Sequence, residues 1–368
     1  MQHKVILSLG SNLGNREDYL QEAIHQINLR VGTVVSVSGL YETPSWGFDS
    51  HHFLNAATLV HSYFPAEDIL AEILQIEKEL GRNRKDSEGY QARTIDIDII
   101  TYDDAIIKTT DLIIPHPQLA HRKFVLIPLV DICPDWVHPE SKTSVKDLLK
   151  NTGDTSALTA TGTLIAPIDK YKNLFEKYTV IEGNIGSGKT SLVKKISEDF
   201  SITPVLESFE NNPFIADFYQ NPECKAFTLE MHFLLERIDQ LSVLNNSTKY
   251  ISDYHLEKCL LFARQTLNKN EYALFIKAFN KLSFNTKSID SYIYLHQPTD
   301  KLLRQIKTRN RSFETNISSG YLEKIGQAYE NQFKLIHAEN KKRIDMSQLD
   351  FKKNPADYMT ILSDIFSR

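Results

Sequence analysis

Alternation of apolar and polar residues is the clearest pattern in the first part of the chain. Residues 93–100 read RTIDIDII, so isoleucine and aspartate alternate at a period of two. This period is typical of a strand with unlike faces, because successive side chains of a strand point to opposite sides. We expect the isoleucines to face a core and Asp96 and Asp98 to project together from the other face.

Other segments place a regular order of elements around this strand. Apolar runs predict strands at residues 4–9, 33–43 and 53–64, and helical spacing predicts helices near residues 19–27 and 65–80. The resulting order, β-α-β-β-α-β, is that of a ferredoxin-like α+β sandwich. We assign residues 1–150 to this first domain.

The second part of the chain shows a different pattern. Residues 151–167 are rich in Thr, Ser, Ala and Gly without a sustained period, so we predict a flexible linker over residues 151–172. Beyond it, short apolar strands alternate with long helices, which is typical of an α/β fold with a doubly wound parallel sheet. The strands are predicted at residues 178–182, 204–206, 250–252 and 291–295, within a second domain at residues 173–368.

Length, charge and cysteine usage narrow the class of protein. The 368 residues suggest two domains, and a net charge of −5 argues against a nucleic-acid or anionic-membrane partner. Three widely spaced cysteines, Cys133, Cys224 and Cys259, fit a reducing compartment better than a disulfide framework or a zinc site. No apolar run approaches the roughly 20 residues that span a bilayer, and the start does not resemble a signal peptide. We therefore expect a cytoplasmic protein.

Two carboxylates on one strand face need a compensating charge. Asp96 and Asp98 would lie about 6–7 Å apart on an extended strand and would repel each other. Magnesium prefers such hard oxygen ligands and usually binds together with a substrate's phosphates. Four basic residues flank the strand in the sequence, namely Arg82, Arg84, Lys85 and Arg93. Carboxylates beside arginines predict a phosphoryl-transfer site, and the alternative is a salt-bridge cluster on the surface.

The second domain carries a separate phosphate-binding pattern. GNIGSGKT at residues 183–190 fits G-x-x-x-x-G-K-T between a predicted strand and a helix at residues 191–200, which is a P-loop. Its backbone N–H groups approach phosphate, Lys189 reaches the terminal phosphates, and Thr190 offers its hydroxyl to magnesium. The predicted nucleotide contacts are Gly183, Asn184, Ile185, Gly186, Ser187, Gly188, Lys189 and Thr190.

Two further features accompany the P-loop. Glu207 directly follows a predicted strand, where ligand-facing residues of such sheets lie. Arg309, Arg311 and Glu314 fall in a polar break between helices, which suggests a lid whose arginines clamp the transferred phosphate. The alternative for this break is a solvated loop.

Six motifs of the first domain together resemble one family. They are LGSNLG at residues 9–14, YETP at 41–44, FLNA at 53–56, GRNR at 81–84, RTIDID at 93–98 and IPH at 114–116. In this order, over roughly residues 1–150, they resemble 6-hydroxymethyl-7,8-dihydropterin pyrophosphokinase. The resemblance implies transfer of pyrophosphate from ATP to the hydroxymethylpterin, giving the pterin diphosphate and AMP, a step of folate biosynthesis.

The same resemblance implies a role for each matching residue. Asp96 and Asp98 would hold two magnesium ions on ATP, and the catalytic arginines would be Arg82 and Arg93. The pterin-binding residues would be Trp46, Phe53, Asn55 and Phe124, and the ATP contacts would be Glu77, Arg84, His116 and Arg122. Without the resemblance, Phe53 and Phe124 are more typical of core aromatics, and His116 of a loop residue. A bare interaction domain is a further alternative, but it would leave the two aspartates and their basic neighbours without a role.

Motifs of the second domain resemble the bacterial deoxynucleoside kinases over roughly residues 175–340. They are ESFENNPF at residues 207–214, DFYQNP at 217–222, ER at 236–237, SDY at 252–254 and RNR at 309–311. The resemblance implies that Glu207 is the general base for a sugar hydroxyl. It also implies that Arg237 and Glu230 bind the nucleoside, and that Arg309 and Arg311 contact ATP from a lid.

Several positions depart from that family. Glu230 stands where many members use Gln, and Gln305 where the lid usually begins with Arg. Tyr254 stands where other branches place an Arg, although Lys258 lies nearby in the sequence. The departures leave open which base is preferred. They also leave an alternative, in which the second domain is a non-catalytic nucleotide-binding or regulatory module.

The two resemblances together predict a bifunctional, multifunctional transferase with two kinase sites. ATP would be the co-substrate of both, with two magnesium ions in the first site and one at the P-loop. The expected partners are small molecules only, namely ATP, the hydroxymethyldihydropterin and a deoxynucleoside. A homodimer through the kinase domain is a further possibility.

Overall fold

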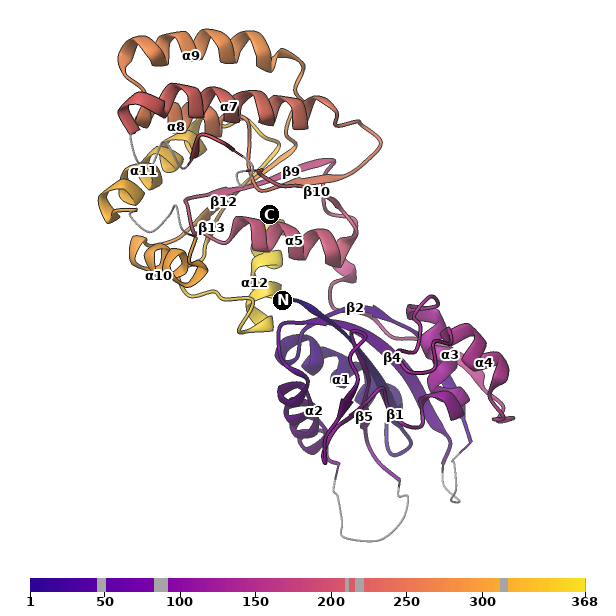
Figure 1. Cartoon of the computed structure of the whole chain (residues 1–368). Helices are drawn as coiled ribbons and strands as arrows, with labels where there is room; N and C mark the ends of the chain where they lie inside the picture. The colour runs from indigo at the N-terminus through magenta and orange to yellow at the C-terminus, as the bar shows by residue number, and fades with distance from the viewer. Residues whose placement is uncertain (45–50, 83–91, 209–211, 216–221, 312–316, 368) are drawn as a thin grey trace. The chain divides into compact units, whose positions relative to one another are not determined.

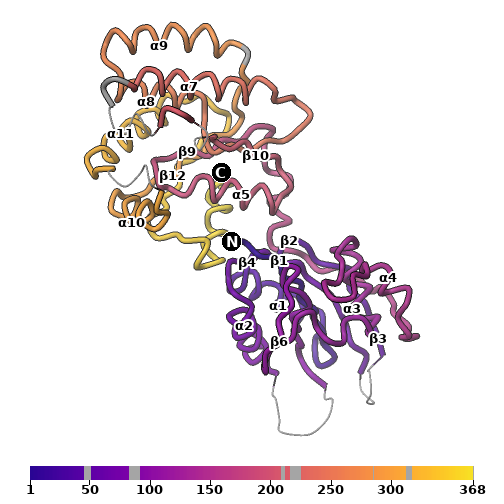
Figure 2. Tube along the Cα trace, in the orientation of Figure 1, coloured from indigo at the N-terminus to yellow at the C-terminus, as the bar shows by residue number. Residues whose placement is uncertain are grey.

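The chain folds into two compact units. The structure is a computed structural model that describes residues 1–44, 51–82, 92–208, 212–215, 222–311 and 317–367. One unit comprises Met1–Lys172 with Asp350–Thr360, and the other Asn173–Leu349 with Ile361–Arg368. Figure 1 colours the chain from indigo to yellow, and Figure 2 traces the same path as a tube. Each unit is described separately below.

The first unit is built on a mainly antiparallel sheet of six strands. They are β1 (His3–Ser11), β2 (Thr33–Val37), β3 (Gly39–Thr43), β4 (Phe53–Ser62), β5 (Asp96–Tyr102) and β8 (Thr159–Thr163). The order is β5-β1-β4-β3-β8, and β2 also pairs with β4. A separate two-stranded ladder joins β6 (Ile107–Lys108) to β7 (Ile113–Ile114).

Helices cover both faces of this sheet. Residues of α1 (Arg16–Arg30) and α2 (Ala66–Glu79) share a core with Val5, Leu7 and Leu9 of β1. On the other face, Ile6 packs in a second core with α3 (Lys123–Ile132) and α4 (Val145–Asn151). β1 is therefore buried on both sides, which explains why its sequence is almost continuously apolar. The sequence pattern did not predict α3 or α4.

The predicted single strand at residues 33–43 is divided in the structure. Ser38 separates β2 from β3, and both then pair with the same edge of β4. The Ser38 Oγ donates to the Gly39 carbonyl at 2.7 Å and accepts from the Ala57 N–H at 2.9 Å. A serine side chain that bonds to nearby backbone groups competes with the regular ladder, so the strand is interrupted there.

The prediction of a flexible linker is wrong for part of residues 151–172. β8 lies in this segment and pairs antiparallel with β3, with Gly39 opposite Thr163. Leu164 and Ala166, directly after β8, are buried in the core formed with α1 and α2. The five strand residues themselves are exposed. An edge strand with no buried face gives no apolar alternation, so periodicity alone could not detect it.

The second unit contains the predicted parallel sheet. Its strands are β9 (Tyr178–Gly183), β10 (Thr203–Val205), β11 (Tyr250–Ser252), β12 (Ser291–His296) and β13 (Asn340–Asp345). They are ordered β10-β11-β9-β12-β13, and all four pairings are parallel. The central strand β9 leads directly into the P-loop, which therefore lies at the carboxyl edge of the sheet, where ligands of α/β folds bind.

Long helices connect these strands, as the sequence predicted. They are α5 (Lys189–Phe200), α7 (Pro222–Ser242), α8 (Lys258–Thr266), α9 (Lys269–Leu282), α10 (Thr299–Arg309) and α11 (Ser319–Leu335). The last helix, α12 (Pro355–Phe366), follows the final strand, and its residues up to Thr360 belong to the first unit. Figure 1 shows α5 on one side of the sheet and α7 and α8 on the other. Tyr178, Tyr292 and Tyr294 of the sheet pack with residues of α7, α8 and α11 in one core. Within the described ranges, none of the helices has the length and apolarity needed to cross a membrane.

Candidate functional sites

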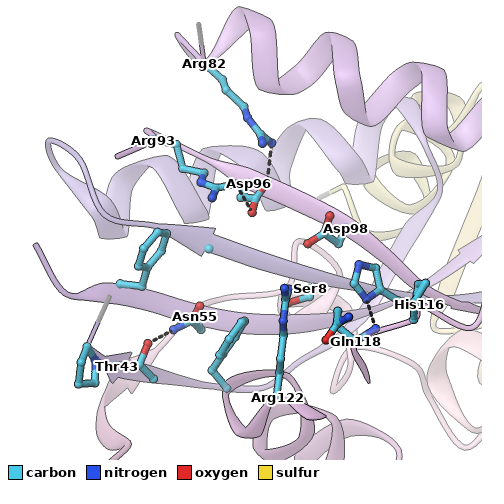
Figure 3. A pocket seen from close by; sticks show the side chains of 15 residues that line it. Ser8, Thr43, Asn55, Arg82, Arg93, Asp96, Asp98, His116, Gln118 and Arg122 are labelled. Atoms are coloured by element: carbon cyan, nitrogen blue, oxygen red, sulfur yellow. Dashed lines mark hydrogen bonds and ion pairs between the residues drawn. The ribbon is translucent and has the colours of Figure 1, made fainter. Parts of the chain in front are cut away.

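A cavity of about 450 Å³ opens in the first unit, where the ends of several strands meet. Figure 3 shows polar and aromatic side chains converging on it from β1, β3, β4 and β5 and from the segment after β7. Its lining residues are Ser8, Gly10, Thr43, Pro44, Phe53, Asn55, Arg82, Arg93, Asp96, Asp98, His116, Pro117, Gln118, Arg122 and Phe124. Its volume is within the usual range for small-molecule sites.

Strand register places both aspartates on the cavity side. In the antiparallel pairing of β1 with β5, Asp96 lies opposite Gly10 and Asp98 opposite Ser8. Ile95, Ile97 and Ile99 are buried on the opposite face, as the alternation predicted. Because glycine has no side chain and that of serine is small, the strand beside the carboxylates leaves room for a ligand.

Asp96 is held between two arginines. Its Oδ1 lies 2.5 Å from Arg82 Nη1, and its Oδ2 lies 2.8 Å from Arg93 Nη1. The side chains of the three residues are 16–23% exposed, and all three line the cavity. The alternative of a salt-bridge cluster is therefore correct about the pairing, but the cluster is part of a concave site.

Asp98 lies on the same wall and carries excess negative potential. Burial, together with the neighbouring Asp96 and Glu77, raises the pKa of Asp98 to about 7. No basic side chain in the described ranges is within ion-pair distance of it. The described residues also contain no group of three or more metal-ligating side chains. Asp98, which has no ion-pair partner among the described residues, and the neighbouring Asp96 fit Mg²⁺ when a substrate's phosphates supply the other oxygens.

The opposite side of the cavity presents two aromatic rings and an amide. Phe53 and Phe124 both line it, and a guanidinium lies over each ring, Arg93 at 5.9 Å from the Phe53 centroid and Arg122 at 5.6 Å from that of Phe124. The buried Asn55 donates from Nδ2 to Thr43 Oγ1 at 2.8 Å, which fixes its amide. The rings thus face the cavity as well as the core.

His116 completes the wall near Arg122. Its Nδ1 accepts from the Gln118 backbone N–H at 3.2 Å, so Nε2 carries the proton of the neutral ring. Burial and the charge of Arg122 lower the pKa of His116, so the ring is neutral at pH 7. A neutral imidazole there offers one N–H donor to a ligand.

Among the described residues predicted for this site, Glu77 does not line the cavity. Glu77 is buried behind it, where its Oε1 accepts from Arg82 Nη1 and from the Ile97 N–H, the latter at 2.8 Å. Its position indicates that it orients Arg82, and its contact with ATP stays a prediction. Trp46 and Arg84 lie outside the described residues.

Several lining residues had not been predicted from the sequence, namely Ser8, Gly10, Thr43, Pro44, Pro117 and Gln118. Thr43 and Pro44 belong to the YETP motif, so that motif was a usable signal. Gly10 belongs to the LGSNLG motif, but Ser8 required the register of β1 with β5, which the sequence alone does not give.

A second cavity, of about 150 Å³, lies in the second unit beside the P-loop. It brings together many residues that the sequence singled out, namely Ile185, Gly186, Lys189, Thr190, Glu207, Glu230, Arg237, Arg309 and Arg311. The remaining P-loop residues Gly183, Asn184, Ser187 and Gly188 do not line it. Residues not predicted as site residues are Ile215, Leu229, Phe233, Lys258, Phe262, Thr266 and Tyr321.

The P-loop lysine is hydrogen-bonded to the backbone of its own loop. Lys189 Nζ donates to the carbonyls of Gly183 and Asn184, at 2.8 and 2.9 Å. Burial, together with the nearby Lys258, lowers the pKa of Lys189 to about 8. Gly183 cannot be replaced without a shift, because a Cβ there would lie 2.7 Å from the Leu295 carbonyl oxygen. Thr190 Oγ1 donates to Asp253 Oδ2, the group expected near a magnesium-binding hydroxyl.

Glu207 is clamped by two cations at the centre of the cavity. Its Oε2 lies 2.6 Å from Lys258 Nζ, and its Oε1 is paired with Arg237 Nη2. Burial opposes ionisation, but Lys258 and Arg237 together lower the pKa of Glu207 well below its usual range. Lys258 thus supplies a positive charge next to Glu207. Tyr254 points elsewhere, with its hydroxyl 2.6 Å from Gln240 Oε1.

Comparisons with known proteins match each part of the chain to a different family. The model of the family described as 7,8-dihydro-6-hydroxymethylpterin-pyrophosphokinase matches residues 6–134, and that of deoxynucleoside kinase matches residues 179–367. The chain belongs to both families. Its pyrophosphokinase part is 45% identical over 142 residues to a 2-amino-4-hydroxy-6-hydroxymethyldihydropteridine pyrophosphokinase of Porphyromonas gingivalis, covering 38% of this chain and 96% of the relative.

The kinase part has relatives of its own. It is 31% identical over 197 residues to a deoxyguanosine kinase of Bacillus subtilis, covering 51% of this chain and 95% of the relative. A solved structure of deoxyadenosine kinase from M. mycoides with bound dCTP aligns with 52% of this chain and 100% of its own, at a TM-score of 0.46 and 24% identity. The pyrophosphokinase match covers residues of the first cavity, and the kinase match covers residues of the second.

Replacing Glu77 should destabilise the pyrophosphokinase unit. Glu77→Ala leaves the buried Ile97 N–H without its acceptor and Arg82 without its partner behind the cavity, so we expect a loss of about 2 kcal/mol or more in the free energy of unfolding. Urea denaturation measures it. Glu72→Ala, on the same helix but in an ion pair with 40% exposure, is the control and should change little. Equal effects of both variants would contradict the assignment.

Proposed function

We propose that the first unit transfers pyrophosphate from ATP to 6-hydroxymethyl-7,8-dihydropterin, as its family does. The observation that carries this proposal is the juxtaposition, in one cavity, of two aspartates, two arginines, two aromatic rings and a fixed amide. A flat heterocycle with a polar edge is bound well by stacking and by an amide, which offers both donor and acceptor. A polyphosphate needs the arginines and a cation on the carboxylates.

The proposed roles follow the positions of the side chains. Phe53 and Phe124 would hold the pterin, and Asn55 would contact its polar edge with the amide oxygen and the free N–H. His116 and Arg122, adjacent on the cavity wall, would bind ATP. Arg82 and Arg93 would exchange their ion pairs with Asp96 for contacts with the transferred group.

One P–O bond forms and one P–O bond breaks in this reaction. The hydroxymethyl oxygen attacks the β-phosphorus, and the bond from the β-phosphorus to the oxygen shared with the α-phosphorus breaks. AMP leaves with that oxygen, and the hydroxyl proton passes to solvent water. Magnesium bound to Asp96 and Asp98 would neutralise phosphate charge. Arg82 and Arg93 stabilise the charge that builds up on the transferred group, which in such reactions is most of the catalysis.

This activity is tested by the nucleotide product. With ATP, magnesium and the hydroxymethylpterin the protein should form AMP. Asp96→Ala combined with Asp98→Ala should lower that rate by about a hundredfold or more, because the phosphate charge is then not neutralised. Quantification of AMP by chromatography measures it, with the exposed Asp104→Asn as control. AMP formation that persists in the double variant would refute the assignment.

For the second unit we propose phosphorylation of a deoxynucleoside by ATP. The P-loop, the anionic Glu207 and the two arginines Arg309 and Arg311 converge on one cavity. Glu207 would accept the proton of the sugar hydroxyl as that oxygen attacks the γ-phosphorus, and ADP would leave. Lys189, Arg309 and Arg311 would stabilise the transferred phosphoryl group, and Thr190 would contact a magnesium ion. The alternative, a non-catalytic nucleotide-binding module, predicts ATP binding without turnover.

The two activities should separate by mutation. Lys189→Ala should reduce deoxynucleoside-dependent ADP by about a hundredfold, because Lys189 contacts the transferred phosphates, while pterin-dependent AMP stays unchanged. The exposed Lys194→Ala on the same helix is the matched control. If no deoxynucleoside yields ADP with the unchanged protein, the second unit is a binding module.

Lys258 is proposed to keep Glu207 ionised as a base. Lys258→Met removes a cation 2.6 Å from the carboxylate, so the pKa of Glu207 should rise and the acid limb of kcat/KM should move to higher pH. Lys258→Arg retains the charge and should leave the limb nearly in place. The measurement is the pH profile of ADP formation. An unshifted limb in the methionine variant would rule out this role.

We also propose a fold description, domain limits, a location and an oligomeric state for the protein. The antiparallel order β5-β1-β4-β3 with two helices on one face supports a ferredoxin-like description of residues 1–150. The domain limits at residues 150 and 173 and a cytoplasmic location stay predictions. A homodimer through the kinase unit is supported by the exposed apolar side chains of Leu235, Leu274 and Phe284. Light scattering should then give the molar mass of two chains in solution.

A further inference from the structure

The far end of the kinase cavity holds a buried carboxyl group that is only partly satisfied. Glu230 is 3% exposed, and its Oε1 accepts from Thr266 Oγ1 at 3.0 Å. Its Oε2 has no hydrogen-bond partner among the described residues, although it is fully buried. A buried acceptor without a partner is costly, so a group that donates to Oε2 would bind there favourably.

Helical spacing shows where Glu230 lies relative to the reacting groups. Glu230, Phe233 and Arg237 are at positions i, i+3 and i+7 of α7, and all line the cavity. Seven residues span about 10 Å along a helix, so the Cα atoms of Glu230 and Arg237 are about that far apart, and the side chain of Arg237 contacts Glu207. A sugar hydroxyl at Glu207 would therefore place the attached base near Glu230.

The helix α8 also runs from the Glu207 end of the cavity to the Glu230 end. Lys258, Phe262 and Thr266 follow at i, i+4 and i+8 on α8, with Lys258 on Glu207 and Thr266 on Glu230. Phe233 and Phe262 thus lie between Glu207 at one end of the cavity and Glu230 at the other. Aromatic and apolar walls with one polar group at the end fit a stacked heterocycle whose edge is read by that group.

We propose that Glu230 selects guanine, with its carboxylate accepting hydrogen bonds from the N1–H and the 2-amino group of the base together. The inference rests on the proposed deoxynucleoside kinase function and names its base. An ionised carboxylate has acceptors only. Guanine presents two adjacent N–H donors on its pairing edge, whereas adenine and cytosine present one donor beside an acceptor nitrogen, which a carboxylate oxygen repels.

A donor nearby complements the third group of the guanine edge. Arg237 is 4% exposed, and two of its guanidinium nitrogens contact Cys259 and Glu207. Its Nε has no hydrogen-bond partner among the described residues. Guanine O6 is an acceptor next to N1–H, and arginine is a frequent partner of that oxygen.

The pKa of Glu230 is compatible with binding guanine through an ionised carboxylate. Burial raises the pKa of Glu230 to about 7, and Arg237 opposes that rise. The two protonation states are therefore close in free energy at neutral pH, and the ligand decides between them. Two N–H donors favour the carboxylate. A base with an acceptor at that position requires the protonated form and gains less.

The test compares bases and a neutral isostere. We measure kcat/KM for deoxyguanosine, deoxyinosine, deoxyadenosine and deoxycytidine with the unchanged full-length protein and with Glu230→Gln. The unchanged protein should prefer deoxyguanosine, with deoxyinosine weaker because it lacks the 2-amino group. Glu230→Gln should lower the ratio of deoxyguanosine to deoxyadenosine by about 10- to 100-fold. Glu236→Gln, on the same helix but outside the cavity, should leave the ratio unchanged.

Calorimetric binding of the same nucleosides separates this proposal from the kinase proposal. Selective binding of deoxyguanosine without ADP formation would refute turnover and support the base assignment. A preference of the unchanged protein for another base, or binding of none, would overturn the role of Glu230. An unaltered ratio in a Glu230→Gln variant that retains the parent's thermal unfolding would overturn it too.

Discussion

Buried charge must be compensated, and this constraint organises both sites. Arg82 and Arg93 are paired with Asp96, Lys258 and Arg237 with Glu207, and Lys189 with two backbone carbonyls. In each case a buried or half-buried cation is paired with an internal acceptor. Leaving such a cation buried and unpaired would be strongly destabilising. Phosphate binding at Arg82, Arg93 and Lys189 would therefore exchange these internal partners for phosphate oxygens.

The two folds position the charged groups of their sites on different elements. In the pyrophosphokinase unit, the flat face of an antiparallel sheet presents both aspartates, and small residues on the adjacent strand keep that face open. In the kinase unit, a backbone loop at the end of a parallel strand binds phosphate, while α7 and α8 extend the site along their length. The first site therefore depends on strand register, and the second on helical spacing.

The sequence predicted those parts of both sites that are encoded locally. The period of two in residues 93–100 predicted which face of β5 carries Asp96 and Asp98, and the P-loop lies between a strand and a helix as expected. Local patterns failed at polar edge strands. β13 has the sequence NKKRID and β8 is wholly exposed, so neither shows apolar alternation, and only pairing with a neighbour defines them.

The sequence by itself determined the two families, the order of most elements and the identity of most charged side chains in the sites. Tertiary structure alone decided which of those charges meet. It placed the buried Glu77 against the Ile97 N–H behind the cavity, and it set Lys258 against Glu207 and Glu230 against Thr266. The physical reason is distance along the chain. Contacts between residues tens of positions apart depend on strand register and helix packing, which no local period records.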